Sequence, residues 1–455
     1  MSGAPERDPG ARAAAGKAAR RRAPLDGHAA FEPAPDRPDP VALLREQEDG
    51  RVPELLPIRH ERMAASPFAF YRAAAVTMAA DLAATPSTGL ISRLCGDAHL
   101  LNFGVYASPE RRLVFDLNDF DESHPGPWEW DVKRLVASLA LAGRENGFKR
   151  RQREAVVRAT AHHYREAMRG FAAMRELDVW YARADIDELR QRLRGRRARR
   201  IEKAGTKARS RDSLQAYHRL TVLDGDGRRR LAADPPLLVP IADLMPDMAR
   251  KLVEEQIREL LAGYRQSLAD DRRRLFDAFE FVDLARKVVG VGSVGTRCWV
   301  VLLTGRDDRD PLLLQVKEAG PSALAGRVGQ VPAPDWDSDG RRIVSGQRIL
   351  QAASDIFLGW HRAEGFDGRA RDFYVRQLRD WKGGADVPSM DPEGMRAYGR
   401  LCGWTLARAH ARGGDRIAIA AYLGSTDRFD RAMAPFAEAY ADRTEADHAA
   451  FAAAS

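Results

Sequence analysis

Two acidic segments in the first third of the chain contain residue types that could carry out phosphoryl transfer. They are CGDAHLLNFG at residues 95–104 and VFDLNDFDES at residues 114–123. Asp97 could accept the proton of an attacking hydroxyl, while Asn102 and Asp116 could hold Mg2+ against a triphosphate. These side chains offer hard oxygen atoms, which suit Mg2+ better than a soft metal ion.

Each of these residues also has a simple structural interpretation. A Gly-Asp pair is common in turns, Asn102 could cap one, and acidic runs are usually solvated loops. The order Asp, Asn, Asp favours a site, because apolar residues surround it where two short strands would hold it. Asp119 and Asp121 could bind a second Mg2+ or the substrate, or they could be solvated. His99 could orient Asp97, or it could be a structural histidine.

A glycine pattern in the second half of the chain predicts a phosphate-binding hairpin. Gly290, Gly292 and Gly295 lie between two apolar strands, and a third strand, LLLQVKEA, carries Lys317. In a dinucleotide-binding fold such glycines open a helix, whereas here the β-rich segment TRCWVVLL follows. A glycine hairpin and a strand lysine are typical of the nucleotide lobe of kinases, where both contact phosphates. Ordinary hairpin glycines and a surface lysine remain the alternative.

Helices and strands around these motifs must position them. We predict one helix between Ser66 and Pro86 that leads into the Asp97 segment. Arg62, Phe68, Tyr71 and Arg72 could face the site, although packing is the expected role of the two aromatic residues. A buried helix is predicted to begin near Trp130, with Asp131 in its first turn, where a carboxylate can receive donors from a neighbouring loop. Further on we predict a helix at 341–355, a hairpin around 365–368, and two closing helices.

The order of the motifs is unusual for kinase chemistry. In kinases the glycine loop and the lysine precede the catalytic aspartate, but here they follow Asp97. A circular permutation explains this order, and permutation is tolerated where the new termini lie close together on the surface. The helix containing LARAHARGGD, which ends near Gly414, would then lead into the Asp97 segment, as in aminoglycoside phosphotransferases with their His-Gly-Asp motif.

Several motifs in order resemble the bacterial domain of unknown function 2252. They are SPFAFYRAAA, LCGDAHLLNFG, DLNDFDESHPGPWEWDVKRL, LLLQVKEA, GQRILQAASDIFLGW, DFYVRQLRDWKG and LARAHARGGD. The resemblance spans about 59–451. The family is in turn more distantly similar to kinase-like proteins.

That similarity implies a role for each site residue. It makes Asp97 the catalytic base and Asn102 and Asp116, with Asp119, the Mg2+ ligands. Lys317 and the three glycines would contact the ATP phosphates. Asp131 would steady the catalytic loop. Kinases pair the strand lysine with a helix glutamate, but the corresponding helix here offers Ser345, Gln347 and Gln351.

The expected fold class is α+β, with a circularly permuted, kinase-like, two-lobed architecture. Residues 1–45 are expected to be disordered because they have little to bury. Residues 46–280 would form a helical lobe with the catalytic and metal-binding loops and a helical insertion that makes the acceptor pocket. Residues 281–385 would form a small β-rich nucleotide-binding lobe, and 386–455 would complete the helical lobe.

Composition favours an intracellular protein without a membrane segment. Lysine and arginine (73) exceed aspartate and glutamate (65), but the excess is spread over many helices. The basic stretch at 186–230 is therefore expected to be solvated, with nucleic-acid binding a remote alternative. The three cysteines lack metal-binding spacing, which favours a reducing cytoplasm. No apolar run reaches the ~20 residues that span a bilayer.

The leading functional hypothesis is an ATP- and Mg2+-dependent phosphotransferase acting on a small hydroxylated molecule. Two alternatives stay open. The missing helix glutamate would suit a nucleotide-binding, pseudokinase-like interaction protein. The same cleft could also serve a nucleotidyl (AMP) transferase.

Overall fold

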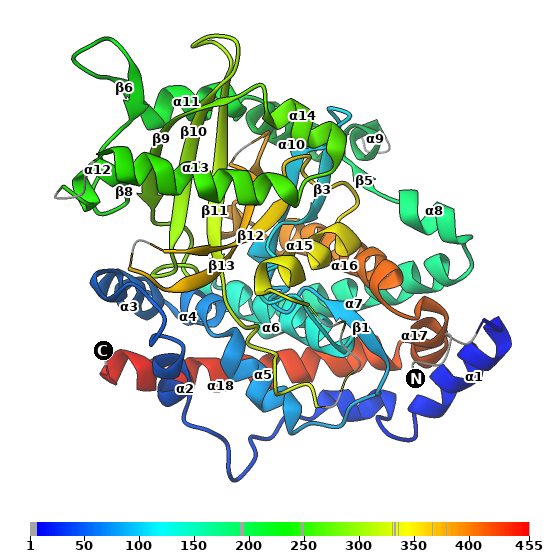
Figure 1. The fold of residues 1–455 in the computed structure, drawn as a ribbon. Helices are drawn as coiled ribbons and strands as arrows, with labels where there is room; N and C mark the ends of the chain where they lie inside the picture. Colours follow the sequence, from blue (N-terminus) through cyan, green and yellow to red (C-terminus); the bar gives the residue numbers. More distant parts are fainter. Residues whose placement is uncertain are drawn as a thin grey trace.

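The structure is a computed structural model of an α+β protein, with the larger sheet on one side and a group of long helices on the other (Figure 1). It describes residues 7–191, 195–246, 250–329, 331, 334, 336–365, 367–378 and 380–454. Within these ranges no helix combines the length and apolar composition needed to cross a bilayer.

The larger sheet has six antiparallel strands in the order β12-β13-β11-β10-β9-β8. Helices cover both of its faces, so the apolar runs of the central strands are buried on both sides. On one face Leu314 and Val316 pack with Leu261, and on the other Leu313 packs with Tyr217. The strands are β8 (Leu238–Pro240), β9 (Glu280–Lys287), β10 (Cys298–Thr304), β11 (Pro311–Ala319), β12 (Gly359–Glu364) and β13 (Ala370–Gln377). The covering helices are α11 (Ser213–Leu220), α13 (Arg250–Gln266), α14 (Asp270–Phe276) and α15 (Asp339–Leu350).

Two predicted hairpins are confirmed in this sheet. Strands β9 and β10 pair antiparallel on either side of residues 288–297, which we call the glycine loop. Strands β12 and β13 form the second hairpin. Lys317 lies on β11 between β10 and β13. Because β8 also pairs with β9, the sheet begins before the expected boundary at 281.

The helical part is built around α6 (Glu129–Glu145), most of whose residues are buried. It packs with α7 (Arg150–Ala172) and α18 (Arg428–Ala454), and α7 packs in turn with α16 (Pro392–Gly413). Helices α6, α16 and α18 confirm the helices predicted near Trp130 and at the end of the chain. The other helices are α3 (Leu56–Ala64), α8 (Glu176–Tyr181), α9 (Ile186–Gln191), α10 (Gly195–Arg209), α12 (Ile241–Leu244) and α17 (Arg416–Leu423).

The single helix predicted between Ser66 and Pro86 is two helices, α4 (Pro67–Ala73) and α5 (Ala75–Ala83). Ser66 caps the first, as predicted, by accepting a hydrogen bond from the amide of Ala69 at 3.1 Å. The chain leaves helical geometry at Ala74, whose carbonyl accepts a hydrogen bond from the hydroxyl of Thr77. The helical periodicity of the sequence continues through this break, which is why it was not predicted.

The expectation that residues 1–45 are disordered is wrong for the described part of that segment. It contains α1 (Pro9–Ala19) and α2 (Pro40–Glu46), and α1 packs on α17. Leu25, Leu43 and Leu44 join the main apolar cluster. Arginines add polar contacts: Arg12 pairs with Asp415, and Arg20 donates to the carbonyls of Ala421 and Tyr422. Gly16 allows the close approach, because a Cβ there would lie 2.0 Å from the carbonyl oxygen of Ala418.

Short strands hold the two acidic segments, as predicted. A two-stranded ladder joins β1 (Ile91–Leu94) to β4 (His124–Pro127), and β2 (Phe103–Ala107) pairs with β3 (Leu113–Leu117). Strands β5 (Ala184–Asp185) and β14 (Gly383–Gly384) extend the second sheet. A separate hairpin joins β6 (Thr221–Leu223) and β7 (Arg229–Leu231).

Two remote parts of the chain meet just before the first acidic segment. Ser92 on β1 forms a β-bridge with Gly414, which directly follows α16. A Cβ on Gly413 would lie 2.9 Å from the Cβ of Arg93. The end of α16 is therefore in contact with the strand that leads into residues 95–102, which we call the Asp97 loop.

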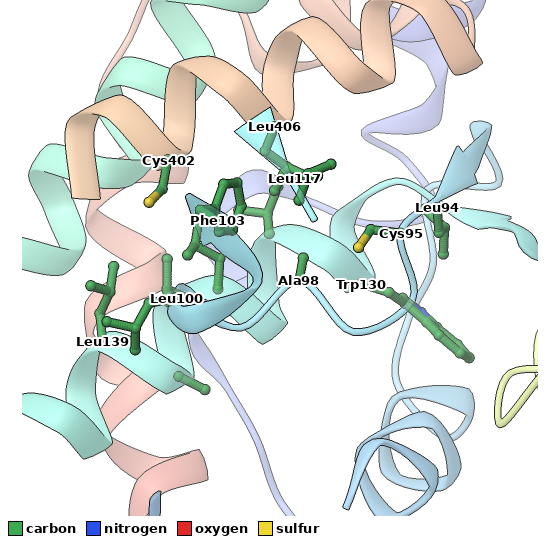
Figure 2. Close-up of a cluster of buried hydrophobic side chains, with 14 of the residues drawn as sticks. Leu94, Cys95, Ala98, Leu100, Phe103, Leu117, Trp130, Leu139, Cys402 and Leu406 are labelled. Carbon is green, nitrogen blue, oxygen red and sulfur yellow. The ribbon is translucent and has the colours of Figure 1, made fainter. Parts of the chain in front are cut away.

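An apolar cluster supports the Asp97 loop from behind. Figure 2 shows Ala98 and Leu100 of the loop among Phe103 and Leu117 of the flanking strands, beneath Leu406 of α16. All of these side chains are fully buried. The loop is thus anchored by its apolar residues, which leaves its polar residues to face the other way.

Candidate active site

A cleft of about 850 Å³ lies where the larger sheet meets the Asp97 loop. The helical part contributes polar side chains from the two acidic segments, together with Arg72 from α4. The sheet contributes Lys317 and the glycine loop. The polar residues that line the cleft include Arg72, Asp97, His99, Asn102, Asn118, Asp119, Asp121, Glu122, Gln315, Lys317, Arg376 and Lys382.

Most of the predicted site residues lie in this one cleft. Asp97, Asn102, Asp119 and Lys317 line it, as do Gly290 and Gly292 of the glycine loop. Gly295 belongs to the same loop, where its φ of +89° and the hydrogen bond that its carbonyl accepts from the amide of Val52 (2.7 Å) fix the turn. It shapes the loop and does not line the cleft.

Asp116 is the predicted metal ligand that does not line the cleft. It is fully buried on β3, and Oδ1 accepts hydrogen bonds from Arg408 on α16 and from the amide of Leu117. Its Oδ2 accepts from the amide of Ala352 at 2.7 Å. Both oxygens are therefore occupied away from the cleft, so Asp116 does not fit the predicted role of a metal ligand.

The helical insertion also differs from expectation. No described residue between 123 and 286 lines the cleft. Helices α11, α13 and α14 instead cover the faces of the larger sheet. Part of the lining comes from α2, α4, α5 and the residues just after α2, and it includes Glu46, Arg51 and Arg72. An acceptor pocket in this cleft would therefore be formed by N-terminal helices and not by the insertion.

Asp97 is held by a buried arginine. Arg134 on α6 donates to its Oδ1 from Nε at 2.8 Å, and a terminal nitrogen of the same guanidinium lies 2.7 Å from that oxygen. The same guanidinium donates to the carbonyl of Tyr71 and stacks on the Tyr71 ring, 3.9 Å from its centroid. Oδ2 of Asp97 accepts a long hydrogen bond from the side-chain amide of Asn102 (3.4 Å) and is the oxygen that faces the cleft. Arg134 was not predicted, although it follows Asp131 by one helical turn and so lies on the same face of α6.

His99 is neutral and has a defined tautomer. Burial lowers its pKa to about 4, even though the nearby Asp97 opposes that change. Its Nδ1 accepts a hydrogen bond from the amide of Leu101, so the proton is on Nε2, which lies 3.7 Å from Oδ2 of Asp97. The ring can thus orient Asp97 without adding a charge to the cleft.

Asp131 and Asn102 fix the backbone of the Asp97 loop. The carboxylate of Asp131 accepts hydrogen bonds from the amides of Cys95 (2.7 Å) and Gly96 (2.9 Å), as expected for a carboxylate in the first turn of α6. His410 on α16 lies 3.2 Å from the same carboxylate. The amide nitrogen of Asn102 donates to the carbonyl of Asp97 at 2.7 Å, which leaves its side-chain oxygen available to a cation.

Asp119 has a buried oxygen without a hydrogen-bond partner among the described residues, its Oδ1. Burial alone would raise the pKa of Asp119, but the charges of Lys317, Arg376 and Lys382 outweigh it and lower the pKa to about 2. The carboxylate is therefore ionised, and Nζ of Lys317 is 3.8 Å from its Oδ1. An ionised oxygen that accepts no hydrogen bond in a cleft is a candidate cation ligand.

Lys317 finds its partner in the second acidic segment. Its buried ammonium lies 2.5 Å from Oδ2 of Asp121, and the hydroxyl of Tyr374 donates to Oδ1 of the same carboxylate. Burial would lower the pKa of Lys317, but Asp119 and Asp121 raise it well above its ordinary value. Asp121 is thus the carboxylate that pairs with Lys317. On α15, Gln347 and Gln351 bond to each other instead.

The glycine loop presents backbone amides and is held from behind. Arg51 and Arg59 donate to the carbonyl of Gly292, and Arg62 donates to that of Gly290. The amides of residues 290–293 donate no hydrogen bond within the part of the chain that the structure describes. A run of available amides on a rigid loop can bind an anion such as a phosphate.

Glu122 is a cleft residue that sequence reasoning did not single out. Burial raises its pKa to about 7, against the lowering effect of the Ala323 amide, which donates to its Oε2. Gly96 is required next to it, because a Cβ at that position would lie 2.2 Å from the carbonyl oxygen of Glu122. The two acidic segments are therefore packed directly against each other.

The donors in this cleft fit Mg2+ bound together with phosphates. No group of three or more His, Cys, Asp or Glu side chains suited to a metal ion occurs in the described ranges. Mg2+ does not need such a group, since it commonly takes one or two protein oxygens, several waters and the phosphates of its substrate. Asn102 and Asp119 provide two suitable oxygens.

One family model matches most of the chain. It is the model for an uncharacterized protein conserved in bacteria (DUF2252), and it covers residues 51–454. No curated protein and no solved structure matches this chain.

Proposed function

The chain belongs to the DUF2252 family of uncharacterized bacterial proteins, and from its cleft we propose that it is an ATP- and Mg2+-dependent phosphotransferase of kinase-like fold. The acceptor is a small molecule with a hydroxyl group. The observation that carries the proposal is the convergence of five elements on one cleft: Asp97, Asn102, Asp119, Lys317 and the amides of the glycine loop. They come from segments nearly two hundred residues apart, so local sequence does not account for their meeting.

The contact between Ser92 and Gly414 supports a circularly permuted, two-lobed kinase-like arrangement. In this arrangement α16 would lead into the Asp97 loop without a break in space, although the chain is cut between them. Four elements would then follow in the order of a kinase nucleotide lobe: the glycine hairpin, strand β11 with Lys317, helix α15 and the hairpin β12–β13.

Asp97 is proposed to act on the acceptor hydroxyl. Arg134 holds Oδ1 of Asp97. Oδ2 of Asp97 can therefore accept the proton of the acceptor hydroxyl or orient that hydroxyl toward the phosphate. The neutral Nε2–H of His99 lies on the same side of Asp97. These contacts keep the carboxylate in one rotamer, which is the positioning that phosphoryl transfer requires.

Lys317 and the glycine loop are proposed to bind the phosphates of ATP. The amides of residues 290–293 would donate hydrogen bonds to phosphate oxygens. The ammonium of Lys317 would bind the same phosphates while Asp121 keeps the ammonium in place. Asn102 and Asp119 would hold Mg2+, which supplies charge neutralisation at the phosphates.

Calorimetric titration of Mg-ATP into the full chain tests this proposal first. We expect the wild type to bind, and Lys317→Met to weaken binding by about tenfold or more because a charge-assisted contact is lost. Lys203→Met, at an exposed lysine on α10, is the matched control and should leave the affinity unchanged. A wild-type chain that binds no Mg-ATP would rule the proposal out.

Phosphate transfer is tested separately with ATP labelled at the γ-phosphate and a small-molecule extract from bacteria. Mass spectrometry of the products should show addition of phosphate to a hydroxylated compound. Addition of AMP instead would indicate nucleotidyl transfer and contradict the proposal. The reaction should require both Mg2+ and Asp97.

One observation favours a second candidate, a nucleotide-binding protein that does not transfer phosphate. The ammonium of Lys317 forms an ion pair with Asp121, and a phosphate of ATP must compete with this carboxylate for the ammonium. Mg-ATP binding without transfer to any compound of the extract would favour this candidate.

A further inference from the structure

Arg72 on α4 faces the cleft beside the Asp97 loop. Its charge acts on both Asp97 and His99, so it lies within electrostatic range of the proposed base. Its backbone carbonyl also borders the tip of the glycine loop, 3.4 Å from where a Cβ of Gly292 would be. Arg72 is thus located between the proposed base and the proposed phosphate-binding loop.

Arg72 is the one cleft cation for which the described residues provide neither a hydrogen bond nor an ion pair. Its Nε is buried and has no acceptor. The other arginines of the cleft are engaged: Arg51 donates to Val294, Arg327 to Ala323, and Arg376 to Gln315 and Asn118. Lys317 is paired with Asp121.

An unpaired and largely buried guanidinium is costly to maintain. Burial lowers the pKa of Arg72, and the charges of Asp97 and Glu145 only partly oppose this effect. Neither carboxylate forms an ion pair with Arg72 in the described structure; Oε1 of Glu145 accepts a hydrogen bond from the amide of Phe68, and Oδ1 of Asp97 is bound to Arg134. A group in this state is stabilised most by a ligand that brings its own oxyanion.

Resting on the proposed function, we propose that Arg72 forms an oxyanion subsite for the acceptor, so that the acceptor carries a carboxylate or phosphate group as well as its hydroxyl. The guanidinium suits this role because its parallel N–H groups match the two oxygens of a carboxylate or phosphate. Its place beside Asp97 would hold the anionic end of the acceptor while the hydroxyl lies at Oδ2.

Titration of inorganic phosphate into the full chain tests this subsite by calorimetry. The titration is made with Mg2+ and a non-hydrolysable ATP analogue at saturation, and again without nucleotide. We expect phosphate to bind in both conditions, and Arg72→Gln to weaken binding by about tenfold or more. Arg72→Lys, which keeps the charge and loses the planar fork, should be intermediate. Arg150→Gln, at an exposed arginine on α7, should have no effect.

Thermal unfolding separates a binding role from a structural one. Because Arg72 has no partner among the described residues, Arg72→Gln should unfold at the same temperature as the wild type or higher. A clear loss of stability in this variant would indicate a structural arginine and overturn the proposal.

Two further outcomes would also overturn it. Phosphate binding that is unchanged in Arg72→Gln would place the anion elsewhere. Phosphate binding that disappears when the ATP analogue is present would assign Arg72 to the nucleotide and not to the acceptor. Nucleotide affinity is measured independently, so a chain that binds phosphate through Arg72 but no nucleotide would refute the phosphotransferase proposal and leave the oxyanion subsite standing.

Discussion

The Nζ of Lys317 lies 2.5 Å from Oδ2 of Asp121, across 196 positions of sequence. This pair links the sheet to the second acidic segment at the centre of the cleft. It gives the buried lysine a defined position that no residue of α15 provides.

Asp121→Asn should therefore weaken Mg-ATP binding. The ammonium of Lys317 remains charged beside Asp119, but it loses the carboxylate that positions it. We expect the dissociation constant measured by calorimetry to rise by about tenfold. The exposed Asp337→Asn is the control. Tighter binding in Asp121→Asn would instead identify Asp121 as a competitor of the phosphates.

Asp119→Asn should remove the effect of Mg2+ on nucleotide binding. Its Oδ1 has no hydrogen-bond partner within the described residues, so the change removes the negative charge of a proposed metal ligand without breaking such a bond at that atom. Affinity for Mg-ATP should fall by about tenfold or more, while affinity for ATP in EDTA should stay the same. Asp226→Asn, in an exposed turn, should behave as the wild type. Equal losses with and without Mg2+ would argue against a metal ligand.

Asp97→Asn should impair transfer far more than binding. An amide cannot accept the hydroxyl proton, so the rate of labelled phosphate transfer should fall by about 10²- to 10⁴-fold. Mg-ATP affinity should change little, because the shorter hydrogen bond that holds the Asn102 side chain goes to the backbone carbonyl of Asp97, which the variant keeps. A variant with normal transfer would show that Asp97 is not the base.

Asp116→Ala should destabilise the protein. Asp116 and Arg408 are both about 1% exposed, and removing the carboxylate leaves a buried guanidinium unpaired. We expect a loss of about 3–5 kcal/mol in the free energy of unfolding, measured in denaturant. Asp226→Ala should be neutral. If Asp116→Ala kept full stability and lost Mg2+-dependent binding, Asp116 would be a ligand after all.

Glu122→Gln should change how stability depends on pH. Burial raises the pKa of Glu122 from 4.5 to about 7, so between these values the folded chain holds a proton that the unfolded chain has released. The stabilisation from this proton is complete below pH 4.5 and is lost as the pH rises through 7. The amide variant lacks this loss, so it should be more stable than the wild type at pH 8 by about 1–3 kcal/mol, and the difference should shrink toward pH 5.

Denaturant unfolding at several pH values measures this difference. His99 contributes the opposite slope, since its pKa is lowered to about 4, but that contribution is common to both proteins and cancels. Glu61→Gln, at an exposed position, should parallel the wild type at every pH. A constant difference across the pH range would show that Glu122 does not titrate near 7.

Local patterns in the sequence determined much of the fold and part of the site. The glycine hairpin, the strand with Lys317, the Ser66 cap and the helix that begins beside Asp131 depend on neighbouring residues. Periodicity, caps and glycine conformation act over a few positions, so they can be read from the chain directly.

The tertiary structure alone decided which partner each acidic residue has. Asp116, Asp119 and Asp121 are near neighbours with the same chemistry, and the sequence does not rank them. The three residues differ in the partners that other segments provide. Arg408 forms an ion pair with Asp116 and Lys317 forms one with Asp121, whereas Oδ1 of Asp119 has no hydrogen-bond partner in the described structure.

The same reason explains the contact of Ser92 with Gly414 and the unpaired state of Arg72. A side chain's partner is fixed by the packing of segments hundreds of residues apart. Sequence determined the residues available to the site, and packing selected which of them face the cleft.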